Sequence, residues 1–457
     1  MGTDRISTAL FLAVAVLTVG GELSKIAWLT DAAAVAVVAF LILEYRRIPL
    51  LQCAVGSAFL AAGLAACAFA DDPLATAERG VIRVLPFLLL FASIVWLQAS
   101  STRSPSLLAL RNTVVSQPPG RRFAWVTGAG HFLGVAFNLA GLSLLTPMIA
   151  KGADPTLQKR LGRAMIQGFG AGTCWSPLYV GTAFIIASVP GVTWSQVGPL
   201  GFVVAIGLLV WGWAFDRAFA RAPGRASKAI APSPVPLGRA VSVRVAGILG
   251  ALFACIVVFV EGLDWSIPIA LAVTAPPFAL IWAVLIRRRD PEFGPGQVAR
   301  GALEILPNLR AEALLFTGAT VFGVGVSALI PDAQAGGTGP IPVLPAWVWI
   351  ITIMAGYALF SAMGIHPVVT VVLVTSILPA EAIGLAPEIL ALSLMVMWGQ
   401  GTNVSPFSAT VLFMARITGA GGWTVAWKWN GLFGAVTTVL LIGVLLAINA
   451  SGFYSGP

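Results

Sequence analysis

The chain has 457 residues, of which 58% are hydrophobic and 10% charged, and its formal net charge is +9. Soluble domains carry about 25% charged residues, so this composition excludes an ordinary soluble enzyme or binding domain. Apolar runs that are long enough to cross a hydrocarbon core of ~30 Å recur along the whole chain. The sequence therefore predicts an all-α polytopic membrane protein.

Eleven membrane-spanning helices are predicted, and the first is expected to be a span rather than a cleaved signal peptide, because no small-residue cleavage pattern follows it. In chain order they cover 6–20, 26–44, 50–70, 82–99, 164–189, 196–216, 240–262, 266–286, 311–330, 389–413 and 429–450. Two further apolar stretches, 122–150 and 346–379, are too long for one ordinary span. We expect each to form a re-entrant helical hairpin, which enters the membrane and returns on the same side.

The distribution of basic residues gives the orientation. With a cytoplasmic N-terminus and two re-entrant hairpins, only Lys25, Arg79 and Arg83 of the 27 lysines and arginines fall outside. A full crossing by either hairpin would swap the sides of every later loop and destroy this asymmetry. The positive charge is therefore assigned to cytoplasmic loops and not to nucleic-acid binding. We expect a multi-pass protein of a bacterial inner membrane, in contact with the lipid bilayer, with its C-terminus outside.

An internal repeat divides the chain at the Pro- and Ala-rich basic linker 220–239. The first half, 1–219, contains "FNLAG" (137–141) and then "GTCWSP" (172–177). The second half, 240–457, contains "FSAMG" (360–364) and then "GTNVSP" (401–406). The two hairpins are expected to open to opposite membrane faces, so the halves are predicted to be inverted copies, as in many secondary transporters.

The repeated Gly-Thr-x-x-Ser-Pro motif predicts that the helices 164–189 and 389–413 are broken, near 170–177 and near 399–406. Proline removes a backbone donor and clashes with the preceding turn, and irregular backbone at membrane depth is tolerated only where it lines a cavity or is buried in protein. Freed carbonyl oxygens can ligate Na⁺, whereas helix N-terminal amides favour an anion. Each motif alone could be a purely structural kink whose hydroxyls bond back to the helix. The recurrence of the motif in both halves favours a functional break instead.

These considerations select candidate site residues. The predicted substrate-binding residues are Asn138, Thr173, Ser176, Ser361, Gln400, Thr402, Asn403 and Ser405. The predicted Na⁺ ligands are Asn138, Gly172, Thr173, Ser361, Gly401 and Thr402.

At these residues the chain resembles the ion transporter superfamily, and within it the divalent anion/sodium symporters. That family has eleven spans, two oppositely facing hairpins with Ser-Asn-Thr tips, and two unwound helices. By position, Asn138 and Ser361 match the two tips. Thr173 and Thr402 match the threonines of the unwound helices. The resemblance implies a homodimer with a fixed scaffold and a moving transport domain, which works as an elevator and is driven by Na⁺.

The match departs from the family at the tips, where "FNLAG" keeps only the Asn and "FSAMG" only a Ser. This departure puts a dicarboxylate substrate in doubt. The function expected from the sequence is Na⁺-coupled symport of a small organic anion, such as a carboxylate, by an elevator mechanism.

Three alternatives remain open, two of them within the same superfamily: a cation/proton antiporter and an inorganic-anion exporter. The third is a membrane binding or scaffold protein that transports nothing. None of the 18 Asp and Glu residues falls in a hairpin or a broken segment, which favours Na⁺ over H⁺ coupling unless Glu44 or Asp216 lies deep in the membrane. His131 and His366 are interpreted as packing residues. No nucleophile–base pattern indicates an enzyme, and no cofactor other than the coupling ion is expected.

Overall fold

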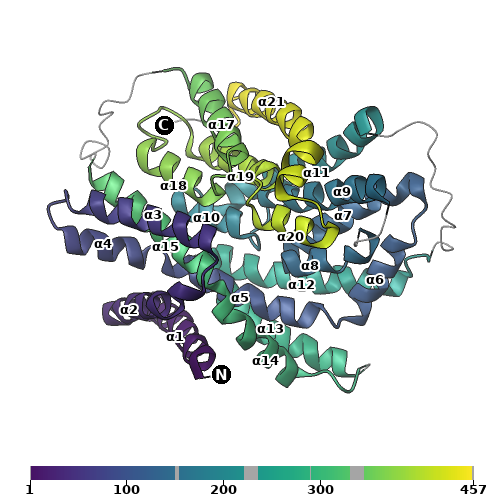
Figure 1. Cartoon of the computed structure of the whole chain (residues 1–457), viewed down its shortest axis with the longest axis horizontal. Coiled ribbons are helices and arrows are strands. Elements are labelled where there is room, and N and C mark those ends of the chain that lie inside the picture. Colours follow the sequence, from purple (N-terminus) through teal and green to yellow (C-terminus); the bar gives the residue numbers. More distant parts are fainter. Residues whose placement is uncertain (1, 150–153, 221–234, 289, 330–343, 455–457) are drawn as a thin grey trace. The chain divides into compact units, whose positions relative to one another are not determined.

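The computed structural model describes residues 2–149, 154–220, 235–288, 290–329 and 344–454. Within these ranges the chain is built from helices and turns, and no residue is in a strand (Figure 1). The predicted all-α fold is confirmed. Most of the linker 220–239, residue 150 of the first predicted hairpin and residue 330 of one predicted span lie outside the described residues.

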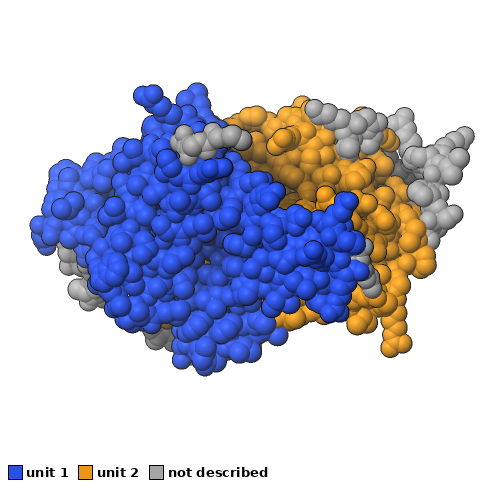
Figure 2. Space-filling model, turned by 90° about the horizontal axis from the view of Figure 1, so that it is seen from below, with its two compact units in different colours: residues 1–100, 254–343, 371–383 blue, residues 101–253, 344–370, 384–457 orange. Residues whose placement is uncertain are grey.

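The chain divides into two compact units, each assembled from segments that are distant in the sequence (Figure 2). Unit 1 comprises residues 1–100, 254–343 and 371–383, and unit 2 comprises residues 101–253, 344–370 and 384–457. Each unit takes segments from both predicted repeats, so the units do not follow the predicted repeat boundary. The predicted repeat relates two halves of the sequence by symmetry, whereas the units are defined by contacts. The division into units therefore does not test the repeat, which stays a prediction.

The elements of unit 1 are mostly long helices. They are α1 (Gly2–Ser24), α2 (Ala27–Glu44), the short turn η1 (Tyr45–Arg47), α3 (Leu50–Cys67), α4 (Pro73–Ile82), α5 (Leu85–Ser101), α13 (Ile267–Arg287), α14 (Pro295–Ile305), η5 (Leu306–Leu309) and α15 (Arg310–Ala328). Helices α12 (Arg239–Gly262) and α18 (Pro367–Ile377) have residues in both units.

Unit 2 contains shorter helices and more interruptions. Its elements are α6 (Pro105–Val115), α7 (Pro119–Phe137), α8 (Leu139–Ser143), η2 (Thr146–Met148), α9 (Pro155–Ala171), η3 (Gly172–Cys174), α10 (Val180–Ser188), α11 (Trp194–Phe215), η4 (Asp216–Ala220), α17 (Ala346–Ala362), α19 (Pro387–Val404), α20 (Ala409–Thr418), η6 (Thr424–Trp429) and α21 (Asn430–Ala450).

Nine helical segments within the described residues are long and apolar enough to cross a membrane. They coincide one for one with the nine predicted spans that carry no Gly-Thr-x-x-Ser-Pro motif. The other two predicted spans, 164–189 and 389–413, are interrupted helices, and their crossing of the membrane stays a prediction. The protein is a multi-pass helical membrane protein.

Both predicted hairpins contain a helix–turn–helix. In the first, α7 ends at Phe137 and α8 begins at Leu139, so Asn138 forms the turn with a positive φ of 53°. In the second, the turn lies at 363–366, where Gly364 has a φ of 96°. Ser361, expected at this tip, lies instead in the last turn of α17. The turn falls later because glycine adopts this backbone conformation without strain.

The core of unit 1 depends on close contact between α3 and α15, made possible by glycines on both helices. A methyl group added at Gly318 would lie 2.6 Å from the carbonyl oxygen of Gly56. One added at Gly325 would lie 2.7 Å from the carbonyl oxygen of Gly63. Both pairs repeat after two helical turns, so the backbones touch along a seam. Small residues have this role in membrane helices because lipid tails provide no hydrophobic drive for helix association.

We expect Gly318→Val to destabilise unit 1, because overpacking of a tight contact costs about 1–3 kcal/mol. The measurement is the melting temperature of the detergent-solubilised protein, which should fall. Gly207→Ala on α11 is the control, since a methyl group there meets nothing within 4 Å. An unchanged melting temperature for Gly318→Val would show that α3 and α15 do not pack in this way.

Candidate functional site

Every predicted site residue lies in unit 2. The first break follows α9, whose start is fixed by Pro155 and by the Asp154 side chain, which accepts a hydrogen bond of 2.9 Å from the Thr156 amide. The helix tightens into η3 and then leaves 175–179 non-helical before α10 begins. The prediction of a break near 170–177 agrees with this geometry.

The second break is shorter than expected. Helix α19 continues through the polar residues 399–404 and ends at Val404. Ser405 is extended (φ −79°, ψ 120°) because the following Pro406 disfavours a helical conformation there. Thr402 stabilises the last turn by donating its hydroxyl to the Gly399 carbonyl oxygen, at 2.9 Å. The predicted break near 399–406 therefore begins only at Ser405, and residues 399–404 are helical.

The two breaks have the same pattern of hydrogen bonds to the backbone. The Ser176 amide donates to the Gly172 carbonyl oxygen at 3.1 Å, and the Ser405 amide donates to the Gly401 carbonyl oxygen at 2.9 Å. The threonine hydroxyls also match, because Thr173 bonds to the Gly170 carbonyl oxygen at 2.7 Å, as Thr402 does to that of Gly399. Equal bonds at equal motif positions support the predicted internal repeat.

The carbonyl oxygens of the two motif threonines are not free. The Thr182 hydroxyl donates to the Thr173 carbonyl oxygen at 2.8 Å, and the Ser408 hydroxyl donates to the Thr402 carbonyl oxygen at 2.7 Å. Sequence analysis missed both donors, because they occupy different positions after the two prolines. Each carbonyl keeps one lone pair for a further partner.

The broken helices cross where the two motifs meet, at Gly170 and Gly399. A methyl group added at Gly399 would lie 2.2 Å from the Gly170 carbonyl oxygen, and one added at Gly170 would lie 2.8 Å from the Gly399 carbonyl oxygen. These glycines extend the shared motif to Gly-x-Gly-Thr-x-x-Ser-Pro, a signal that a longer comparison of the halves would have found. The backbone of each repeat therefore touches the equivalent backbone of the other.

Four buried oxygen atoms near this crossing have no hydrogen-bond partner among the described residues. They belong to Gln400 (Oε1), Asn403 (Oδ1), Ser405 (Oγ) and Ser361 (Oγ). Their side chains are 4%, 1%, 1% and 0% exposed, respectively. A buried polar atom without a partner is costly, and such groups commonly mark a bound ion, water or ligand.

Contacts of the motif glycines place two of these four atoms, on Asn403 and on Ser361. The Asn403 side-chain amide lies beside Gly170, about 3 Å from where a methyl group there would be, so it faces the crossing. The Ser361 hydroxyl lies beside Gly401, and Tyr357 packs against the same glycine. The structure therefore brings the second hairpin, the end of α19 and the end of α9 together.

Asn138 is less closely involved. Its side-chain oxygen accepts a hydrogen bond of 2.9 Å from the Leu139 amide in its own turn. The last turn of α7 reaches the first break through Val135, which packs on Gly172. The first hairpin thus touches the break, although the Asn138 oxygen is already in use.

The first break is apolar on its other side, where Trp175 packs against Phe202 and Phe253. An almost wholly apolar cavity of about 720 Å³ lies beside the first break. It is lined by Trp175 and Leu178 together with residues of α6, α7 and α12. Tyr179, which sequence analysis missed, has a buried hydroxyl without a partner among the described residues.

His131 is a hydrogen-bonded packing residue, as predicted. Its Nε2 accepts from the Trp175 indole N–H at 3.2 Å, and its Nδ1 lies 3.1 Å from the Gly168 carbonyl oxygen. This pattern fits a neutral ring that donates from Nδ1. His366 Nδ1 lies 3.3 Å from the Val368 amide, within the turn of the second hairpin.

The two acidic residues that could have supported proton coupling are both paired with arginine. Asp216 is 1% exposed, and Arg160 donates to both of its oxygens at 2.6–3.0 Å. Glu44 is fully buried and forms ion pairs with Arg47 and Arg310 at 3.1 and 3.0 Å. Each of these carboxylates is therefore held in an ion pair with at least one arginine.

No protein-family model and no curated protein matches the sequence. Among solved structures the chain is similar to the YdaH transporter of Alcanivorax borkumensis, whose crystal structure is described as having an unusual topology. The TM-score is 0.53 at 15% sequence identity, over 81% of this chain and 86% of that one. The chain therefore shares its fold with a membrane transporter.

We expect Gly399→Ala to separate α9 from α19, since its methyl group cannot lie 2.2 Å from a carbonyl oxygen. The melting temperature of the purified protein should fall. The effect should exceed that of Gly431→Ala on α21, where a methyl group meets nothing within 4 Å. Equal melting temperatures for the two variants would contradict the crossing of the broken helices.

Proposed function

We propose that the protein is a secondary active transporter that imports a small organic anion together with Na⁺, and that the crossing of the two broken helices is its site. The observation that carries the proposal is the group of unpartnered buried oxygens on Gln400, Asn403, Ser405 and Ser361. Asn403 lies beside Gly170 and Ser361 lies beside Gly401, and the chain as a whole shares its fold with a transporter.

The chemistry of these atoms suits a hard monovalent cation. Amide and hydroxyl oxygens are neutral ligands, and together they replace the hydration shell of Na⁺. Thr173 and Thr402 add hydroxyl oxygens whose protons already point to backbone carbonyls, so their lone pairs are available. The predicted ligand Gly401 contributes a carbonyl oxygen that accepts the Ser405 amide, whereas that of Gly172 accepts the amides of both Trp175 and Ser176.

The absence of charged side chains from this group favours coupling to a cation. An isolated anion moved into a buried, neutral site loses hydration free energy that neutral donors replace only in part. A Na⁺ ion bound at the same place offsets this cost through its attraction for the anion. Each ion therefore raises the affinity for the other, which is the requirement for symport.

The apolar cavity beside the first break supports an organic rather than an inorganic anion. Its volume of about 720 Å³ and its apolar walls suit the hydrocarbon part of a small carboxylate. The polar oxygens come chiefly from the second motif, whereas the first motif contributes Cys174 and Trp175. In this proposal the anionic group and the hydrocarbon part are held by different halves of the repeat.

An elevator mechanism is part of the proposal, and the division into units supports it. All of the predicted site residues belong to unit 2 and none to unit 1, so unit 2 is suited to carry the ligands as one body. Unit 1, with its glycine seam between α3 and α15, is suited to be the scaffold and the surface of a homodimer. The mass of the protein in detergent measures the oligomeric state.

The first test is a thermal-shift screen of the purified protein against small organic and inorganic anions, in Na⁺ and in choline. A ligand that binds only the native state raises the melting temperature. At a concentration of 100 times its Kd it increases the free energy of unfolding by about 2.7 kcal/mol. We expect an organic anion to stabilise the protein only when Na⁺ is present. A pH-dependent shift with Na⁺ alone would favour the cation/proton antiporter, and a Na⁺-independent shift with an inorganic anion would favour the exporter.

Substitution of the unpartnered oxygens tests the site itself. Asn403→Ala is expected to lower the affinity for Na⁺ about tenfold or more, which is about 1.4 kcal/mol, since it removes an oxygen ligand that would replace one water of the ion's hydration shell. The readout is the Na⁺ concentration that gives half of the thermal shift. Ser188→Ala on α10 is the control, because that hydroxyl bonds only to the Phe184 carbonyl oxygen of its own helix.

The same variants decide between transport and mere binding. In sealed proteoliposomes the anion found by the screen should accumulate along a Na⁺ gradient with the Ser188→Ala protein but not with Asn403→Ala. Binding without any uptake or exchange by the unmodified protein would support the binding or scaffold alternative instead.

A further inference from the structure

A second polar site lies in unit 1 and contains no residue of the two broken helices. A cavity of about 1000 Å³ is formed by the start of α1, the end of η1, and the segment α14–η5–α15. We call it the basic cavity. Its charged lining residues are Asp4, Arg5, Arg47, Arg300, Glu304 and Arg310.

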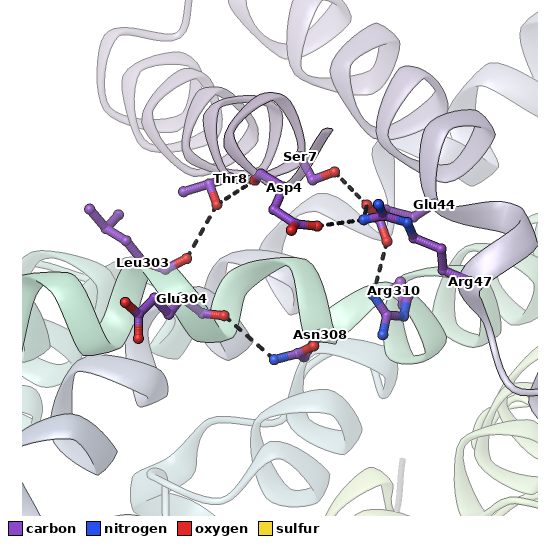
Figure 3. Close-up of polar contacts among 9 residues, drawn as sticks. All are labelled: Asp4, Ser7, Thr8, Glu44, Arg47, Leu303, Glu304, Asn308 and Arg310. Atoms are coloured by element: carbon purple, nitrogen blue, oxygen red, sulfur yellow. Dashed lines mark hydrogen bonds and ion pairs between the residues drawn. The ribbon is translucent and has the colours of Figure 1, made fainter. Parts of the chain in front are cut away.

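One wall of the basic cavity is held rigid by ion pairs (Figure 3). Fully buried Glu44 accepts hydrogen bonds from Ser7, from Arg47 at 3.1 Å and from Arg310 at 3.0 Å. Arg47 also pairs with Asp4. The negative charge of both carboxylates is therefore already neutralised by the arginines that hold them.

Two further arginines on the cavity have no such partner. Arg5 and Arg300 are exposed, and neither has an ion pair or hydrogen bond with any described residue. Glu304 is the remaining acid of the lining, and it forms no ion pair with Arg300 one turn earlier on α14. Four arginines thus face two lining carboxylates and buried Glu44, which leaves an excess of positive charge.

We propose that the basic cavity binds the phosphate group of an anionic membrane phospholipid, with Arg5 and Arg300 as its ligands. The planar guanidinium group matches phosphate oxygens in a bidentate geometry. A cluster of basic groups at the end of a membrane helix is attracted to anionic lipids.

The position of the cavity favours a lipid over a soluble phosphate. It lies at the ends of two candidate spans, which begin at Asp4 and end at Arg47, so its arginines are at the level of lipid headgroups. Ile6, next to Arg5, is 55% exposed and offers an apolar surface to an acyl chain. This inference does not depend on the proposed transport function, because none of these residues belongs to unit 2.

The test counts phospholipids that stay bound to the detergent-purified protein, by native mass spectrometry after titration with phosphatidylglycerol or phosphatidylcholine of equal chain length. In the double variant Arg5→Gln/Arg300→Gln, the number of bound phosphatidylglycerol molecules is expected to fall about fivefold or more. The matched control is Arg239→Gln/Arg244→Gln on α12, which removes two exposed arginines outside the cavity, also predicted to be cytoplasmic, and should retain it.

Three results would overturn the proposal. Equal losses in both double variants would show attraction to surface charge in general. Equal binding of phosphatidylcholine would exclude recognition of an anionic lipid. Stabilisation of the protein by inorganic phosphate or glycerol phosphate, abolished in the cavity variant, would assign the site to a soluble anion. If the double variant does not fold, the single variants Arg5→Gln and Arg300→Gln are compared with Arg239→Gln by the same count.

Discussion

The contact between Gly170 and Gly399 is the constraint on which unit 2 depends. Only glycine permits the carbonyl oxygen of each broken helix to lie against the backbone of the other. This close approach places the end of α19 beside the end of α9 and brings Asn403 to the crossing.

In the second motif the proline ends the helix directly, since α19 stops at Val404, whereas in the first motif the helical turn has already ended at Cys174. In both motifs a hydroxyl group stabilises the end of the helix. Each proline prevents the preceding serine from continuing the helix, and a hydroxyl from beyond the break bonds to the motif threonine's carbonyl oxygen. Most of the exposed backbone is satisfied internally in this way. The side-chain oxygens of Gln400, Asn403, Ser405 and Ser361 are buried and have no hydrogen-bond partner among the described residues.

Much of the fold was predictable because a membrane imposes a simple pattern. Nine unbroken spans follow from apolar length alone, and the breaks follow from proline. The exact end of α19 did not follow, because the Thr402 hydroxyl bonds back to the Gly399 carbonyl oxygen and the helix continues to Val404. The position of Ser361 within α17 was missed because Gly364, not the polar residue, forms the turn. Cross-helix contacts such as Gly170–Gly399 depend on the packing of distant segments, which no local pattern encodes.

The two copies of the motif share the hydrogen bonds of the serine amide and the threonine hydroxyl, but they differ in their side chains. Two equally polar breaks would bury many unpaired oxygens whenever the site was empty, at a cost of about 1–3 kcal/mol for each. In the first copy, Cys174 and Trp175 replace the Asn403 and Val404 of the second, so apolar packing stabilises one half of the crossing. In the proposed site the buried oxygens without a partner among the described residues are therefore few, and an ion with its counter-anion would satisfy them.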